Sequence, residues 1–424
     1  MDAGCLFSRV SLRIKSKVAE PWIEHEQQGE KKGATPSCTQ TDDQKLRIGI
    51  NAITLLSPRT GIGNYVFALG NELLASPEVT PSFFYAKEWS PHLRKDPLPN
   101  INSVKMRVKR YVPGAYPIFR TISSGYFRRG LKNHPIDVYH EPNYLAYRFD
   151  GPVVITVHDL SWIRHPETHP KERLRAMERY FPRSLDNASA IITDCQFVKN
   201  ELAEVFGVAP AKITPVLLGV SPDFSPMPQA HAQSVLESYG LSFGGYFLCV
   251  GTLEPRKNIP TLLEAFSSLP PDIQKCYPLA LAGMRGWLTS GIESRMRPLA
   301  DKGLVKVLGY VPDPHMSALY SGARAFILPS LYEGFGLPVL EAMACGTPVI
   351  ASRSSSIPEV AGDAGILCDP MDVTAFADAM RQLAEDAPLR QNLSAAGIAR
   401  AASFSWQATA KATISVYRNT LAKI

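Results

Sequence analysis

The stretch PSLYEGFGLPVLEAMACG, residues 329–346, decides the fold of this chain. It follows an apolar, strand-like run and places Gly334 and Gly336 in a loop, where glycine adopts backbone angles that other residues avoid. Pro338 suits the first position of a helix, and Gly346 suits the position that ends one. The stretch therefore predicts a strand, a glycine loop and a short helix, whose N–H groups and positive end would bind an anion such as phosphate.

Two carboxylates flank this loop. Glu333 stands just before the glycines, and Glu341 falls in the first turn of the predicted helix. Their spacing allows both carboxylates to border one anion pocket.

The composition is that of a globular protein with two domains of ordinary size. Of the 424 residues, 45% are apolar and 20% are charged, and the net charge of +6 permits anionic ligands without requiring nucleic acid. The seven cysteines form no Cys-x-x-Cys pair, so we expect buried thiols in a reducing compartment. No apolar run reaches the length of a membrane span, and the N-terminus lacks the apolar core of a signal peptide. These features predict a cytoplasmic protein.

Strand-like and helix-like segments alternate along most of the chain. This alternation predicts an α/β protein with two doubly wound, Rossmann-like domains, each a parallel sheet covered by helices on both faces. The proline-rich segment 222–228 interrupts the alternation. We therefore expect an N-terminal domain over 45–225, a C-terminal domain over 226–405 and a last helix over 406–424. Residues 1–44 are polar and turn-forming, which predicts a disordered extension or a segment upstream of the true start.

Individual elements follow from apolar periodicity. Strands are predicted at 46–53, 82–86, 103–108, 137–141, 153–158, 190–195, 213–218, 246–251, 278–283, 305–309, 325–329, 348–352 and 365–368. Helices are predicted at 62–75, 171–186, 196–206, 260–268, 291–301, 314–321, 338–345, 372–385 and 389–402.

A second strand-to-helix turn carries two cations. The run GTLEPRKN, residues 251–258, follows an apolar strand and precedes a helix that begins near Pro260. Arg256 can grip two oxygens of a diphosphate at once, and Lys257 supplies a compact charge. Ligands of open α/β sheets bind beyond the carboxyl ends of the strands, which favours a diphosphate site here. A solvated pair of surface cations is the alternative interpretation.

Gly61 and Gly63 follow the first strand, so a backbone N–H could approach a ligand there. Val66 occupies the place of the third glycine of the dinucleotide fingerprint, so the signal for NAD is weak. A plain turn is the alternative interpretation. No Gly-Lys-Ser/Thr phosphate loop occurs in the chain.

Polar side chains also end two predicted strands. His158 and Asp159 follow a buried-type strand, where His158 could bind a sugar hydroxyl or polarise a leaving group. A histidine hydrogen-bonded at a strand end is the alternative. Glu141 ends the neighbouring strand and could meet an acceptor, although holding the following loop is the interpretation we favour.

Other reaction classes lack their signatures. The chain has no nucleophile elbow, no Asp-x-Asp pair and no Cys/His spacing typical of a metal site. We therefore expect neither a metal nor another cofactor.

The segment 97–136 is basic and aromatic. It contains eight lysines and arginines, five interleaved tyrosines and phenylalanines, and no aspartate or glutamate. Such a segment can lie on anionic lipid headgroups or bind RNA. An ordinary basic face beside core aromatics is the interpretation that the segment alone favours.

These motifs, in this order, resemble those of the family-4 glycosyltransferases, retaining enzymes with the GT-B fold. The match is strongest over 251–369 and includes the glycine loop, IPEV at 357–360 and GILCDP at 365–370. The resemblance implies two Rossmann-like domains that face each other across a cleft. The N-terminal domain would take the acceptor, the C-terminal domain would bind the nucleotide sugar, and the last helix would cross back to the N-terminal domain. Residues 1–44 have no counterpart in the family pattern.

The resemblance also implies roles for residues of the C-terminal domain. Arg256 and Lys257 would hold the donor diphosphate. Glu333 would touch the sugar hydroxyls, and Glu341 would accept hydrogen bonds from the ribose. The backbone N–H groups that help to position sugar and phosphate would be those around Gly334, Phe335, Gly336 and Leu337.

Two residues of the N-terminal domain would complete the site. Gly63 would bring a backbone N–H to the phosphate, and His158 would line the sugar pocket near the reacting centre. The resemblance thus implies that catalysis needs the cleft shut and rests on His158 together with Glu333, Arg256 and Lys257. The two cations and the helix dipole would take the place of a metal.

The whole chain looks like bacterial O-antigen and exopolysaccharide mannosyltransferases that use GDP-sugars. The resemblance favours GDP-mannose or GDP-rhamnose as donor and a lipid-linked glycan at the inner face of the membrane as acceptor. The basic segment 97–136 would then touch the anionic membrane, and no nucleic-acid partner is expected. A UDP-sugar donor and a GT-B sugar-nucleotide epimerase are the alternatives. A non-enzymatic nucleotide or RNA binder would not need Glu333, Glu341, Arg256 and Lys257 to coincide.

Overall fold

The computed structural model describes residues 45–57, 59, 61–94, 115–284, 286 and 290–423 of the chain. Contacts join Lys45–Ile424 into one compact unit. The extension predicted over 1–44 and the strand predicted over 103–108 lie outside the described residues.

The first sheet has seven strands in the order β3-β2-β1-β4-β5-β6-β7. Neighbouring strands run parallel, except that β3 pairs antiparallel with β2. The strands are β1 Leu46–Asn51, β2 Val79–Phe84, β3 Trp89–Ser90, β4 Val138–Glu141, β5 Val153–Val157, β6 Ala190–Thr193 and β7 Ile213–Pro215. Its helices are α1 Gly61–Ala75, α3 Ala115–Gly130, α4 Ser161–Arg164, α5 Lys171–Asn187 and α6 Gln196–Phe206. All five residues of β5 are buried, as expected for a central strand covered on both faces.

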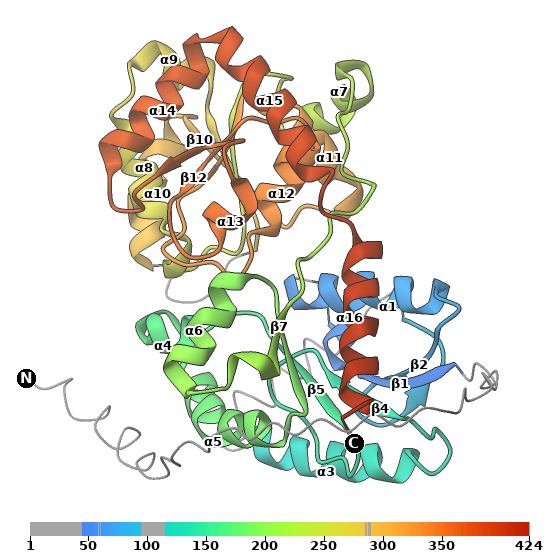
Figure 1. Ribbon diagram of the computed structural model, residues 1–424. Helices are drawn as coiled ribbons and strands as arrows, with labels where there is room; N and C mark the ends of the chain where they lie inside the picture. The colour runs from blue at the N-terminus through green and yellow to red at the C-terminus, as the bar shows by residue number, and fades with distance from the viewer. Residues whose placement is uncertain are drawn as a thin grey trace, which may run out of the picture. The chain divides into compact units, whose positions relative to one another are not determined.

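The second sheet has six parallel strands in the order β10-β9-β8-β11-β12-β13. The strands are β8 Phe247–Val250, β9 Leu279–Ala282, β10 Val305–Gly309, β11 Ala325–Leu328, β12 Val349–Ser352 and β13 Ile366–Cys368. The helices are α7 Gln229–Ser238, α8 Ile259–Ser267, α9 Pro271–Cys276, α10 Ser290–Asp301, α11 Asp313–Ser321, α12 Leu337–Ala344, α13 Ile357–Ala361, α14 Val373–Glu385 and α15 Ala387–Ala401. In Figure 1, α8, α10 and α14 gather on one face, while α12 packs with α13 and α15 on the other.

Successive side chains of β8 and β11 serve the two faces of this sheet. Phe247 and Ile327 belong to the apolar cluster under α8 and α14, whereas Leu248 and Phe326 belong to the cluster that includes α12. This alternation follows from the two-residue period of a strand. The sequence thus predicts both sheets because each strand is a short apolar run between helices.

The last helix, α16 Trp406–Leu421, lies against the first sheet's domain (Figure 1). Tyr417 is fully buried there, and its hydroxyl lies 2.7 Å from Nδ1 of His140. The two connections between the domains run side by side, since Val220 forms a bridge with Ser405. The crossing helix is therefore confirmed. The break at 222–228 falls between the two sheets, and the domain boundaries themselves stay predictions.

Several helices were not predicted. Three of them, α4, α9 and α13, have four to six residues, too few to show a helical period. α7 begins directly after the proline-rich break, and α3 contains glycines and serines that are poor helix formers. None of the described helices is both long and apolar enough to cross a membrane.

Candidate functional site

The glycine loop and the two cations lie together at the switch point of the second sheet. β8 and β11 are neighbours in the middle of the sheet, and the chain leaves them toward opposite edges. Arg256 and Lys257 follow β8 in the 3-10 turn Pro255–Lys257, and Glu333 follows β11. Ligands of doubly wound sheets bind beyond the carboxyl ends of the strands at such a point.

Glu333 is held by both cations. Lys257 Nζ donates to Glu333 Oε1 over 2.7 Å, and Arg256 Nη1 donates to Oε2 over 3.2 Å. Ser330 Oγ also donates to Oε1, over 2.5 Å. Burial would raise the pKa of Glu333, but the charges of Lys257 and Arg256 outweigh it and lower the pKa to about 2. Glu333 is therefore a carboxylate at neutral pH and can only accept hydrogen bonds. We call Arg256, Lys257 and Glu333 the charge cradle.

Arg256 is oriented by further bonds to the loop and to the residue that precedes its own 3-10 turn. Its Nη1 donates to the carbonyl of Tyr332 over 2.6 Å, and its Nη2 donates to Glu254 over 2.8 Å. With the bond to Glu333, three of its five N–H donors are engaged, and the bond of Lys257 to Glu333 engages one of three ammonium protons. Both cations thus keep donors that could reach a diphosphate. The two are not a solvated surface pair, because the side chains are 15% and 11% exposed.

The loop has, at Gly336, a backbone conformation that glycine adopts readily and other residues avoid. Gly336 has a φ of 106°, and a Cβ there would lie 2.5 Å from Cδ1 of Ile357. α12 begins at the next residue, and Gly346, with a φ of 72°, follows its end as predicted. Glu341 is the fifth residue of α12 and so begins the second turn; placing it in the first turn was wrong, because the helix starts at Leu337.

Glu341 lies half-buried on α12. Tyr320 Oη donates to its Oε2 over 2.8 Å. Burial raises the pKa of Glu341 to about 7, although the hydrogen bond from Tyr320 acts in the opposite direction. This carboxyl group therefore changes charge near neutral pH.

The loop also touches the first domain. A Cβ at Gly334 would lie 2.2 Å from the carbonyl oxygen of His158, so only glycine permits this approach. Leu160 N donates to Tyr332 Oη over 3.0 Å, and Cys195 Sγ donates to the carbonyl of Gly334 over 3.2 Å. The glycine loop is thus a contact between the domains as well as the predicted anion site.

His158 directly follows β5, and both of its ring nitrogens face oxygen acceptors. Nδ1 lies 2.8 Å from Oδ2 of Asp194, and Nε2 lies 2.8 Å from the carbonyl oxygen of Pro142. Burial lowers the pKa of His158, but Asp194 outweighs it and the net shift is upward. His158 is therefore hydrogen-bonded at its strand end, as the alternative interpretation described. Its predicted place near the reacting centre stays a prediction.

Gly63 lies buried in the first turn of α1. Two residues further on, Tyr65 meets the ring of His158 edge-on, with the ring centroids 4.9 Å apart. The N-terminal half of α1 and the residue that follows β5 therefore lie together. A contact between Gly63 and a donor phosphate stays a prediction.

Glu141 holds a loop. It accepts hydrogen bonds from Asn51 Nδ2 and Tyr139 Oη, each over 2.7 Å, and from Asn143 N over 3.0 Å. Burial raises its pKa to about 7. With three internal donors, Glu141 fits the structural role that we favoured over contact with an acceptor.

Several residues of the site carried no signal in the sequence. The carboxylate of Glu359 accepts from Gln196 N over 2.9 Å and from Phe197 N over 3.1 Å, so it caps α6 from the other domain. Other site residues are held through hydrogen bonds by Asp194, Tyr320 and the serines 354–356. Only the position of Asp194 just after a strand could have indicated it, because the other contacts join segments far apart in the chain.

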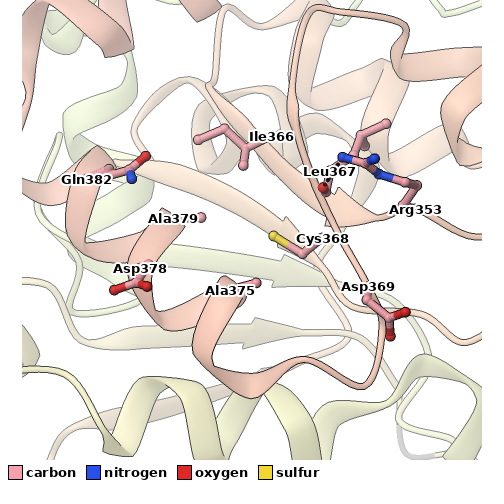
Figure 2. A pocket seen from close by; sticks show the side chains of 9 residues that line it. All are labelled: Arg353, Ile366, Leu367, Cys368, Asp369, Ala375, Asp378, Ala379 and Gln382. Atoms are coloured by element: carbon pink, nitrogen blue, oxygen red, sulfur yellow. Dashed lines mark hydrogen bonds between the residues drawn. The ribbon is translucent and has the colours of Figure 1, made fainter.

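The described residues contain no cluster of metal ligands, but they form a hollow apart from the charge cradle. No group of three His, Cys, Asp or Glu side chains in the described part of the chain is placed to hold a metal ion. A hollow of 460 Å³ lies between the edge strand β13 and α14 (Figure 2). Its lining comprises Arg353, Ile366, Leu367, Cys368, Asp369, Ala375, Asp378, Ala379 and Gln382, and it includes no residue of the charge cradle.

Known proteins share the fold of this chain and are similar to it in sequence. Residues 59–224 match the family described as Glycosyltransferase Family 4, and residues 244–400 match Glycosyl transferases group 1. Sucrose-phosphate synthase from Thermosynechococcus elongatus superposes with a TM-score of 0.73 at 22% identity, covering 90% of this chain and 100% of that one. This likeness shows the shared two-domain fold.

Two Escherichia coli proteins are similar in sequence. O-antigen chain mannosyltransferase B is 37% identical over 368 residues, which are 85% of this chain and 96% of that protein. Serotype-specific mannosyltransferase WbdA is 32% identical over 235 residues, which are 54% of this chain but 28% of that longer protein. With both family matches and a relative aligned over nearly its whole length, the chain belongs to the family-4 glycosyltransferases and has the GT-B fold.

Proposed function

We propose that this glycosyltransferase moves a mannosyl or rhamnosyl group from a GDP-sugar to a hydroxyl of a growing lipid-linked glycan in cell-surface polysaccharide synthesis. The observation that carries the proposal is the charge cradle at the switch point between β8 and β11. The names of the two Escherichia coli relatives support the choice of a mannosyl group. The enzyme would work in the cytoplasm, at the inner face of the membrane.

The donor diphosphate would lie between the two cations and the N-terminus of α12. Arg256 and Lys257 supply charge-assisted hydrogen bonds, and the positive end of the α12 dipole adds a partial positive charge. Gly334 to Leu337 would offer backbone N–H groups to sugar and phosphate. Glu341 would accept hydrogen bonds from the ribose.

The charge cradle fits a departing diphosphate. Glu333 is too weak a base to take a proton at neutral pH, because its pKa is about 2, so its role would be to accept hydrogen bonds from sugar hydroxyls. The acceptor oxygen would bond to the anomeric carbon on the face from which the diphosphate leaves, with retention of configuration. The acceptor proton would pass to a phosphate oxygen of the leaving GDP. Arg256 and Lys257 would stabilise the charge that develops on that group.

A thermal-shift comparison of nucleotides tests the donor. GDP and GDP-mannose should raise Tm, since a ligand at a hundred times its Kd adds about 2.7 kcal/mol of stability. UDP and UDP-glucose should raise Tm less. A larger shift with UDP-sugars would overturn the GDP assignment, and formation of UDP without an acceptor would favour an epimerase.

Donor affinity should depend on pH through Glu341. Its pKa of about 7 means that the carboxylate, the better acceptor for ribose hydroxyls, replaces the neutral acid as pH rises from 6 to 8. The affinity for GDP should therefore increase over this range in the wild type. In Glu341→Gln the affinity should be lower and nearly independent of pH. An unchanged pH profile in this variant would place the ribose elsewhere.

The helix α3 provides the surface for the proposed contact with the membrane. Its exposed apolar side chains are Ile118, Phe119, Ile122 and Tyr126, which are 42–58% exposed. Arg128, Arg129 and Lys132 are exposed at and just beyond its C-terminal end. An amphipathic surface of this kind suits anionic headgroups, and each basic residue near such a membrane contributes about 1 kcal/mol.

Replacing these three cations by glutamine should weaken binding to phosphatidylglycerol vesicles about a hundredfold, from about 1 kcal/mol for each charge. Cosedimentation measures the loss, and binding to phosphatidylcholine vesicles should stay weak throughout. The matched control replaces the exposed Arg295, Arg297 and Lys302 of the other domain and should leave binding unchanged. Equal losses of vesicle binding in both triple variants would show that net charge, rather than the surface of α3, determines binding.

A further inference from the structure

Three consecutive serines hold the glycine loop by its backbone. They follow β12, a neighbour of the strand that leads into the loop, and each hydroxyl bonds a different part of the loop. Ser354 Oγ donates to Leu331 O over 2.6 Å, Ser355 Oγ accepts from Glu333 N over 2.8 Å, and Ser356 Oγ lies 2.9 Å from both Glu333 O and Phe335 O. We call Ser354–Ser356 the serine clamp.

Ser355 has the unusual backbone of the three. Its φ is 52°, in the left-handed region that favours glycine and, among other residues, asparagine. Such strained residues persist where the surroundings fix them, and they gather at functional sites. A glycine would relieve this strain but would lose the hydroxyl that meets the Glu333 N–H.

Glu333 is consequently fixed from both ends. Lys257 and Arg256 orient its carboxylate, while Ser355 binds its N–H and Ser356 binds its carbonyl. The N–H would otherwise be a buried donor without a partner, because Glu333 is 7% exposed. The position of the carboxylate therefore depends on the peptide that Ser355 holds.

We propose that Ser355 is a positioning residue for the donor sugar: its hydroxyl, held by a strained backbone, fixes the Glu333 peptide. The inference rests on the proposed role of Glu333 in donor binding. A merely structural serine would lower stability and activity together when replaced. Replacement of a positioning serine should lower activity without a matching loss of stability.

Two variants at this position should give opposite results. Ser355→Gly relieves the strain but leaves the Glu333 N–H without its acceptor, so these opposing effects should leave Tm close to that of the wild type while kcat/KM for GDP-mannose falls about tenfold. Ser355→Thr keeps the hydroxyl but puts a β-branched residue in the left-handed region, so Tm should fall while kcat/KM stays within about twofold. Ala86→Gly is the matched control, since Ala86 has a φ of 66° in the other domain, and it should raise Tm without changing turnover.

Amide hydrogen exchange of the ligand-free protein supplies a readout that needs no donor. Peptides covering 330–336 should exchange faster in Ser355→Gly, and in Ser355→Ala if the glycine variant does not fold, but at the wild-type rate in Ser355→Thr. Unchanged exchange with wild-type turnover in Ser355→Gly would overturn the inference, as would a parallel loss of Tm and turnover in all variants. If the wild type uses neither GDP-mannose nor GDP-rhamnose, the donor proposal fails, and the exchange rates alone decide whether the clamp acts.

Discussion

Replacing Lys257 with methionine should reduce sugar transfer about ten- to a hundredfold and destabilise the fold at the same time. The variant removes a charge-assisted contact to the donor, which typically contributes about 1.5–3 kcal/mol. It also leaves Glu333 buried with part of its charge uncompensated, and breaking a buried ion pair costs about 3–5 kcal/mol. Initial rates with GDP-mannose and urea unfolding measure the two effects.

The double variant Lys257→Met/Glu333→Gln separates these effects. Removing both charges should restore much of the lost stability, because no unpaired carboxylate remains, while transfer stays low. The acid side of the stability curve gives a further check: the folded pKa of Glu333, about 2, lies below its ordinary value of 4.5, so its contribution is present above pH 4.5 and is lost as pH falls toward 2. Strictly additive free energies in the double variant would show that the two side chains do not interact.

The second large effect is expected from Gly334→Ala. Its Cβ would lie 2.2 Å from the carbonyl oxygen of His158 and 3.0 Å from Cβ of Asp159, so the loop and the first domain cannot keep their contact. Because His158 is proposed to complete the site, kcat/KM should fall at least a hundredfold, with about 1–3 kcal/mol of stability lost to overpacking.

Gly291→Ala is the matched control for this variant. Gly291 lies in α10, and a Cβ there would meet nothing within 4 Å. That variant should keep wild-type turnover and gain a little stability, since alanine favours a helix over glycine. Wild-type turnover in Gly334→Ala would show that the contact with His158 is not needed for transfer.

The sequence predicts most of the fold because its signals are local. Short apolar runs such as 153–157 and 325–328 alternate with helical periods, and this alternation specifies two doubly wound sheets. Glycine and proline positions predict the loop at 329–336 and the end of α12. The closeness of Arg256, Lys257 and Glu333 is expected from the rule that ligands bind beyond the carboxyl ends of the strands.

What the sequence does not show depends on contacts between distant segments. The serine clamp holds Glu333 from 22 residues away, and Glu359 caps a helix 163 residues earlier. The occupied nitrogens of His158 depend on Asp194, which lies 36 residues further along the chain. The sequence alone does not predict the apolar face of α3, because that face depends on which side chains of the helix are exposed.

Calorimetric titration of GDP-mannose tests the central claim, that the charge cradle binds the donor. The wild type and the Lys257→Met/Glu333→Gln variant, both shown to be folded by circular dichroism, would be titrated side by side. The account predicts saturable binding to the wild type and an affinity at least tenfold lower for the variant. Equal affinities would contradict it.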